Sequence, residues 1–280
     1  MAPTERKYRP AMLDARTVGI LLLVMLGACT ATSPDDTKPA HKAFDAGTPD
    51  PVTGIWRPSP KTSWQWQLSG TFDTSVDAAV YDVDLFNTDV KVIDQLHAQG
   101  RKVICYFDTA YEPGRPDASA FVASVLGNDM EGWPEQKWVD IRTATVRNIM
   151  TARMELAVQK RCDSVEADDL DVLQNNSGFP ITAADQLAFC RGLAAEAHAR
   201  KLSIALKNNV DEIADLVADF DYAINEECSR YNECDTEQPF VTEGKAVLHA
   251  EYHSTCPAPH AGFSTILKHL NLDAWRLVCP

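Results

Sequence analysis

Residues 164–171, Ser-Val-Glu-Ala-Asp-Asp-Leu-Asp, form a short alternating segment that ends in a run of acids. Successive side chains of a β-strand point to opposite faces, so Ser164, Glu166 and Asp168 share one face, and Val165 and Ala167 share the other. Unpaired buried carboxylates are costly, so an apolar strand that ends in acids is hard to explain by packing alone. We expect Asp168 to point into the mouth of a sheet or barrel.

Segments of the same kind recur along the chain and alternate with helical patterns. Eight segments have strand character, rich in β-branched, aromatic or aliphatic residues: 63–68, 79–84, 102–108, 164–168, 202–207, 222–226, 246–252 and 275–278. Helical periodicity falls between most of them, at 91–99, 118–126, 146–160, 183–200 and 211–219, and more weakly at 263–270. Alternation of this kind predicts a mainly parallel sheet, and no Gly-x-Gly-x-x-Gly motif supports a dinucleotide-binding fold. The pattern predicts a single α/β domain, a (β/α)8 TIM barrel over residues 56–280, with an elaborated loop at 109–140.

Polar side chains follow most of the predicted strands, at the edge where the active sites of such barrels lie. Each acid alone has another explanation: Asp82 can cap a turn, Asp169 and Asp171 can begin a helix, and Lys207 can neutralise a neighbouring acid. The set as a whole predicts a site. Its candidate substrate-binding residues are Trp64, Asp84, Tyr106, Asp108, Glu166, Asp169, Lys207, Asn208, Asn225, Glu251 and Tyr252.

Two of these strand ends supply a candidate catalytic pair. Tyr222, Ile224 and Glu226 share one face of their strand, which places Glu226 at the mouth together with Asp168, unless a bulge gives the position to Glu227. Glycoside hydrolysis needs two such carboxyl groups, one as nucleophile or base and one as proton donor. Aromatic side chains near the strand ends, which stack on sugar rings, agree with this class of substrate.

The N-terminus has the order of a bacterial export signal. Arg6, Lys7, Arg9 and Arg16 precede a short apolar run, which ends at residues 26–29, Leu-Gly-Ala-Cys. This ending resembles a lipobox, so residues 1–28 are a predicted lipoprotein signal peptide and Cys29 is the predicted lipidation site; an ordinary signal peptide is the alternative. Residues 29–55, mostly polar, predict a flexible tether. The expected location is the membrane, facing the periplasm or the cell exterior, with the lipid anchor as the membrane contact.

The charge of the chain bears on its partners. The formal net charge is -14, and removing residues 1–28 takes away four positive and two negative charges, giving -16. Such a field repels phosphates, so nucleic acid is not an expected partner, whereas a cationic polymer is attracted. We expect a monomer that uses no cofactor and no metal.

Without Cys29, seven cysteines remain, so one is left unpaired. Export permits disulfides. The close pair Cys228 and Cys234 predicts one bridge, Cys256 with Cys279 a second, and Cys162 can reach Cys190. Cys105 lies within an apolar run and is interpreted as a buried hydrophobic residue.

Several segments together resemble glycoside hydrolase family 114, the endo-α-1,4-polygalactosaminidases. The resemblance runs through residues 63–70, 103–108, 165–171, 205–208, 223–228, 234 and 250–252, in the family's order. It implies a (β/α)8 barrel that cuts α-1,4-linked galactosamine polymers internally, with Asp168 as nucleophile and Glu226 as acid/base. Family members often have Asp-Asn where this chain has Asp168-Asp169, so this chain carries an extra carboxyl group there.

Two other functions fit parts of the pattern. A barrel that binds an amino-sugar polymer without cutting it would keep the same groove. A metal-dependent hydrolase would use Glu166, Asp168, Asp169 and Asp171 as oxygen ligands, although their spacing lacks the glycine of an EF-hand loop.

Overall fold

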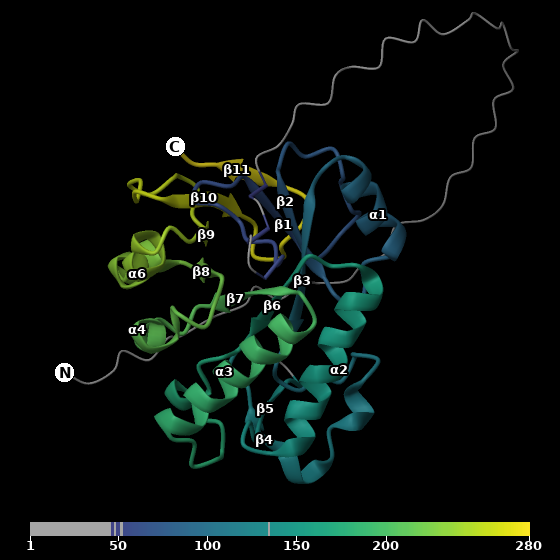
Figure 1. Ribbon diagram of the computed structural model, residues 1–280. Helices are drawn as coiled ribbons and strands as arrows, with labels where there is room; N and C mark the ends of the chain where they lie inside the picture. Colours follow the sequence, from purple (N-terminus) through teal and green to yellow (C-terminus); the bar gives the residue numbers. More distant parts are fainter. Residues whose placement is uncertain (1–45, 48, 51–52, 134) are drawn as a thin grey trace, which may run out of the picture.

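The chain folds as a barrel of parallel strands with helices on the outside (Figure 1). The computed structural model describes residues 46–280 except 48, 51, 52 and 134. The main sheet has the order β1-β2-β3-β6-β7-β8-β9-β10-β11, in which the first eight strands are parallel neighbours and β11 is antiparallel to β10. The strands are β1 Trp64–Gln67, β2 Val80–Asp84, β3 Lys102–Asp108, β6 Ser164–Asp168, β7 Ser203–Lys207, β8 Tyr222–Glu226, β9 Val247–Glu251, β10 Phe263–Lys268 and β11 Arg276–Val278. The predicted (β/α)8 barrel is confirmed.

β1 and β10, the first and last of the eight parallel strands, meet at a seam. β11 and the turn before it bridge this seam. The Leu68 amide donates to the Leu272 carbonyl at 2.9 Å, and the Gln65 side chain donates to the Ala274 carbonyl at 2.7 Å. The indole of Trp64 donates directly across the seam, to the Ser264 carbonyl at 2.8 Å.

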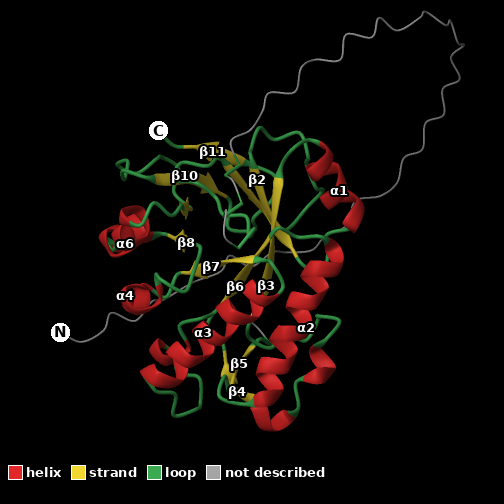
Figure 2. Cartoon of the chain, in the orientation of Figure 1, coloured by secondary structure: helices red, strands yellow, loops and turns green. Residues whose placement is uncertain are grey.

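The longer helices lie outside the strands (Figure 2). They are α1 Val90–Ala98, α2 Ala144–Lys160 and α3 Ala183–Ala199, and the shorter ones are α4 Ile213–Leu216, α5 Cys228–Tyr231 and α6 Gln238–Thr242. Polar caps fix where the long helices begin: Asp89 accepts from the Lys91 amide, and Thr182 forms a capping box with Asp185. Among the described residues, no helix is both long enough and apolar enough to cross a membrane.

The alternation of side chains divides the apolar residues into two layers. Val165, Ala167, Cys105 and Phe107 face outward and pack with the helices. Trp66, Ile104, Ile224 and Leu248 belong to a separate cluster that fills the barrel interior. The polar residues at the C-terminal ends of the strands, on the same face as these inward side chains, therefore lie together at the mouth of the barrel.

Three predicted elements differ in the structure. Residues 263–270 show helical spacing, with apolar residues at 263, 266, 267 and 270, yet 263–268 form β10, the eighth barrel strand. The predicted eighth strand at 275–278 is instead the antiparallel β11. Residues 118–126 contain two 3-10 turns, Ala118–Ala120 and Ala123–Val125, before β4 (Leu126–Asp129), which pairs with β5 (Lys137–Val139). Closing the sheet gives hydrogen-bond partners to the backbone N–H and C=O groups of β10. This stabilisation outweighs the preference for a helix that the spacing of its apolar residues suggests.

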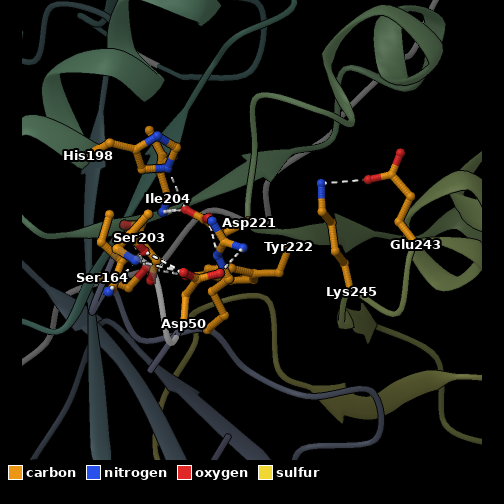
Figure 3. A network of polar contacts seen from close by, with 12 residues as sticks. Asp50, Ser164, His198, Ser203, Ile204, Asp221, Tyr222, Glu243 and Lys245 are labelled. Carbon is orange, nitrogen blue, oxygen red and sulfur yellow. Dashed lines mark hydrogen bonds and ion pairs between the residues drawn. The ribbon is translucent and has the colours of Figure 1, made fainter. Parts of the chain in front are cut away.

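Described residues before Trp56, within the predicted tether, contact the folded domain. The indole of Trp56 donates to the buried Ala46 at 2.6 Å, and Pro49 and Trp56 form an antiparallel bridge. Arg57 links this segment to the barrel through Asp221 at 2.7 Å. Figure 3 shows Asp221 in this network, where it also accepts from His198 and from the Ile204 amide.

The disulfides are Cys105–Cys162, Cys228–Cys234 and Cys256–Cys279, and Cys190 is free and buried. The predicted bridges Cys228–Cys234 and Cys256–Cys279 are confirmed, and one of the seven described cysteines is unpaired, as predicted. The predicted pairing of Cys162 with Cys190 is wrong. Cys105 points outward from β3 toward the turn before the neighbouring β6, which brings its Cα to 6.0 Å from that of Cys162.

Candidate active site

A buried lysine joins the two candidate catalytic carboxylates at the mouth of the barrel. The Nζ atom of Lys207, at the end of β7, lies 3.0 Å from Oδ2 of Asp168 and 2.8 Å from Oε2 of Glu226. These two oxygens contact the same atom, so they lie no farther apart than 5.8 Å, the sum of the two distances. The Asp168 and Glu226 side chains are about one-fifth exposed, at 20% and 21%. Both carboxyl groups are thus open to the cleft.

Asp168 is held by contacts from its own turn and from the neighbouring strand. Its Oδ1 accepts from the Asp169 amide at 2.9 Å, and its Oδ2 accepts from the Tyr106 hydroxyl at 3.2 Å. Asp169 adopts a left-handed backbone conformation, with φ of 59°. This conformation, which Asp tolerates better than most residues, turns the chain sharply after β6 and aims the amide back at the carboxylate.

Glu226 is fixed at both carboxyl oxygens. The Tyr252 hydroxyl donates to Oε1 and Lys207 contacts Oε2, while the Glu226 amide donates to Oδ1 of Asn208 at 2.9 Å. Glu227 follows in a left-handed conformation, with φ of 60°, and pairs with Arg230 at 2.7 Å. Glu226 therefore lies in the carboxylate cluster, whereas Glu227 lies beside it with its own partner.

Two further acids lie beneath this pair inside the barrel. Glu166 is fully buried and its Oε1 lies 3.3 Å from Nζ of Lys207. Burial raises the pKa of Glu166 to about 7, despite the opposing effect of Lys207, and burial together with Glu166 raises the pKa of Asp82 well above its usual range. Because burial raises both pKa values and Glu166 also raises that of Asp82, the pair favours a state in which at least one of the two acids is protonated.

A second carboxyl pair flanks Asp168. Asp108 and Asp169 are hydrogen-bonded through their side chains, and burial raises the pKa of both; each is further raised by the charge of Asp168. Asp108 also accepts from the Ala110 amide at 2.5 Å, and its carbonyl accepts from the buried Arg153. This pair therefore holds a proton close to the predicted nucleophile.

Asp168 and Glu226 line a cleft of about 630 Å³ at the mouth of the barrel. Of the predicted site residues, the structure brings together at the cleft Asp84, Tyr106, Asp108, Asp168, Asp169, Lys207, Asn208, Glu226 and Tyr252. Asp84 is already paired with Arg115 at 2.6 Å and caps the Phe86 and Asn87 amides.

Four predicted substrate contacts do not line the cleft. Asn225 lies on the opposite face of its strand from Glu226, and Glu251 on the opposite face from Ala250, so both point outward. Asn225 donates to Glu237. Glu251 accepts from His249 and from the Ser229 amide. Trp64 lies two residues, and thus one layer, below Trp66 inside the barrel. Glu166 lies one layer below Asp168 and is fully buried.

Some cleft residues lie outside the predicted set of substrate-binding residues. Trp66 lines the cleft at the end of β1, and the alternation rule applied to this strand would have selected it over Trp64. Arg115, Trp133 and the segment 270–272 also line it. The 270–272 segment was missed because β10 was interpreted as a helix; the loop residues carry no periodic signal.

The alternative function, a metal-dependent hydrolase, is not supported by the arrangement of these acids. Within the described part of the chain, the group with metal-ligand spacing is Cys228, Cys234 and His249, whose two cysteines are joined in a disulfide. The centre of the acidic cluster is occupied by the Lys207 ammonium.

A (β/α)8 barrel with two open carboxyl groups across one cleft is an arrangement that many glycoside hydrolases use. The model of glycoside hydrolase family GH114 matches residues 47–280. The chain therefore belongs to family GH114 and is a glycoside hydrolase.

Solved structures agree with this assignment. Aspergillus fumigatus Ega3, in a complex with galactosamine, is 41% identical, with a TM-score of 0.75 over 80% of this chain and 97% of its own. The glycoside hydrolase domain of PelA from Pseudomonas aeruginosa is 11% identical, with a TM-score of 0.60 over 77% of this chain and 97% of its own, and is similar in fold. The search of curated proteins gave no match.

Proposed function

We propose that this protein is an endo-α-1,4-polygalactosaminidase in which Asp168 and Glu226 carry the reaction. The observation that supports this most directly is the pair of carboxyl oxygens held within 5.8 Å of each other by one ammonium group. Retaining glycosidases have their carboxyl groups about 5 to 5.5 Å apart, and inverting ones about 6.5 to 9.5 Å. The spacing favours retention.

In the proposed reaction, Asp168 attacks the anomeric carbon and forms a covalent bond as the glycosidic bond breaks. Glu226 gives its proton to the leaving oxygen. Glu226 then takes a proton from water, whose oxygen attacks the same carbon and releases Asp168. Tyr106 and the Asp169 amide would keep the Asp168 carboxylate aimed at the sugar, and Tyr252 would do the same for Glu226.

The proposed substrate is a cationic galactosamine-containing polymer. The galactosamine bound to Ega3, at 41% identity, supports this class, as does the acidic character of the chain, which has a formal net charge of -14. Asp108, Asp169 and Asn208 line the cleft beside the catalytic pair and are the proposed contacts to hydroxyl and amino groups. Trp66 and Trp133 offer faces for stacking on sugar rings.

We also propose that the protein is exported as a lipoprotein that acts as a monomer. The order of charges, apolar run and Cys29 supports this, and these residues lie outside the part of the chain that the structure describes. Labelling with radioactive palmitate tests the anchor: incorporation that is lost in Cys29→Ala supports it, and incorporation that persists contradicts it.

The proposed activity is tested by incubating the purified protein with partly deacetylated α-1,4-galactosaminan. New reducing ends should appear together with fragments of intermediate length, as internal cleavage requires. Release of single sugars from the start would contradict endo action. Tight binding of the polymer without new ends would contradict hydrolysis and favour the binding barrel.

A further inference from the structure

We propose that Lys207 is a positioning residue that serves as the shared counter-ion of Asp168 and Glu226, stabilising the negative charge as it passes from one to the other. This inference rests on the proposed function, since it assigns a role within the same site. It replaces the predicted role of Lys207 as a contact to the substrate.

The geometry favours carboxylates over sugar as the partners of Lys207. Its side chain is 0% exposed, and its Nζ atom lies within 2.8 to 3.3 Å of Glu226, Asp168 and Glu166. The Trp66 ring closes the remaining side, with its centroid 5.0 Å from Nζ. An ammonium group with 0% exposure and three carboxylate neighbours is directed at those acids and not at a substrate amine or hydroxyl.

The balance of charge in the reaction explains why one cation between two acids is useful. Before the first step, Asp168 is ionised and Glu226 is protonated. As Asp168 forms its bond to the sugar it loses its negative charge, and Glu226 gains one by giving its proton to the leaving oxygen. The second step reverses both changes. The negative charge therefore moves between two oxygens that both contact Nζ, and the cation need not move.

The layer below keeps this lysine charged and in place. Burial favours the neutral amine, but Asp168, Glu226 and Glu166 together raise the pKa of Lys207 well above its ordinary value. Burial raises the pKa values of both Asp82 and Glu166, so this buried pair favours one negative charge over two. The ammonium is thus left free to balance the catalytic pair.

The test compares two buried lysines. Lys207→Met keeps the length of the side chain and removes its charge; we expect kcat to fall by about 10² to 10³-fold, with KM within about threefold of the parent. Lys268→Met is the matched control, because Lys268 is also buried in the barrel but donates to the Asp273 and Trp275 carbonyls. It should lose stability and keep kcat within about threefold of the parent. A folded Lys207→Met variant with the kcat of the parent overturns the proposal.

A second measurement on the parent protein does not depend on the folding of any variant. In ¹⁵N NMR of labelled lysines, Lys207 should remain an ammonium group throughout the pH range of activity, and a neutral amine at the pH of highest activity overturns the proposal. If the parent releases no reducing ends, the proposed function is wrong. The NMR measurement tests the charge of Lys207 and does not test that function. If the parent and the Lys207→Met variant are equally active, the counter-ion role of Lys207 is contradicted and the proposed function is not.

Discussion

At the scale of single residues, the site depends on which face of a strand each side chain takes. Alternation from Ser164 correctly places Asp168 at the mouth, and the same rule applied to β8 and β9 would have excluded Asn225 and Glu251. The sequence allowed Lys207 to neutralise a neighbouring acid but did not identify which acids, because its three partners lie on two neighbouring strands. Contacts of that kind depend on the register of the sheet, which no local pattern contains.

The shared proton of Asp108 and Asp169 makes a prediction about pH. Both pKa values are raised, so the pair keeps its proton at low pH and loses it as the pH rises through the raised values. The second negative charge then repels the first and disturbs the Asp169 turn, whose amide donates to Asp168. The charged and titratable groups that interact with this pair are Asp168, Asp171, Tyr106 and Arg153. We expect kcat/KM of the parent to fall on the alkaline side.

Asp169→Asn should move this alkaline fall to higher pH, because an amide donates to Asp108 without a titrating proton. Its kcat/KM at low pH should stay within about tenfold of the parent, as a conservative change that keeps one hydrogen bond. An alkaline limb that is unchanged in this variant would mean that another group controls it.

At the scale of elements, the sequence predicted seven of the eight barrel strands because each combines β-rich composition with a polar end. It failed at β10, whose apolar residues repeat with helical spacing. Only the need to close the barrel makes this segment a strand, and that is a property of the whole sheet. The predicted helix at 118–126 was wrong for a related reason, because the 3-10 turns of this segment follow the shape of the loop around it.

Two disulfides stabilise different elements and should have different effects. Cys105–Cys162 joins β3 to the start of β6 across 57 residues, and Cys228–Cys234 closes a loop of 6. The entropy of loop closure predicts losses of about 4 and about 2 kcal/mol in the free energy of unfolding when each pair is replaced by alanine. Chemical denaturation measures both, with Cys190→Ala as the control.

The two disulfides also separate stability from activity. The shorter one fixes α5, which begins two residues after Glu226, so its removal should lower kcat/KM at a temperature where the protein stays folded. Loss of Cys105–Cys162, on the outer side of the barrel, should leave kcat/KM close to that of the parent. Equal losses of activity would contradict this assignment of α5.

At the scale of the whole molecule, the barrel holds an array of acids in its interior, and this affects its stability. Glu166 has a folded pKa of about 7, above its ordinary value of 4.5. A group whose pKa is raised on folding contributes stability that is fully present below the unfolded pKa and is lost as the pH rises through the folded one. The contribution of Glu166 should therefore decline from about pH 4.5 to about pH 7.

The variant Glu166→Gln isolates this effect, because glutamine does not titrate. The free energy of unfolding of the parent minus that of the variant should decrease across this range, as measured by urea denaturation at several pH values. A difference that is constant, or that increases with pH, would show that Glu166 does not take up a proton on folding.

The central claim is that Asp168 and Glu226 together cleave the polymer. The most direct measurement is release of reducing ends from galactosaminan by the parent, by Asp168→Asn and by Glu226→Gln, with the exposed acids Asp215→Asn and Glu243→Gln as matched controls. The account predicts full release by the parent and the controls, and losses of about 10² to 10⁴-fold or more in both cleft variants, which remain folded. Undiminished release by either cleft variant would contradict it.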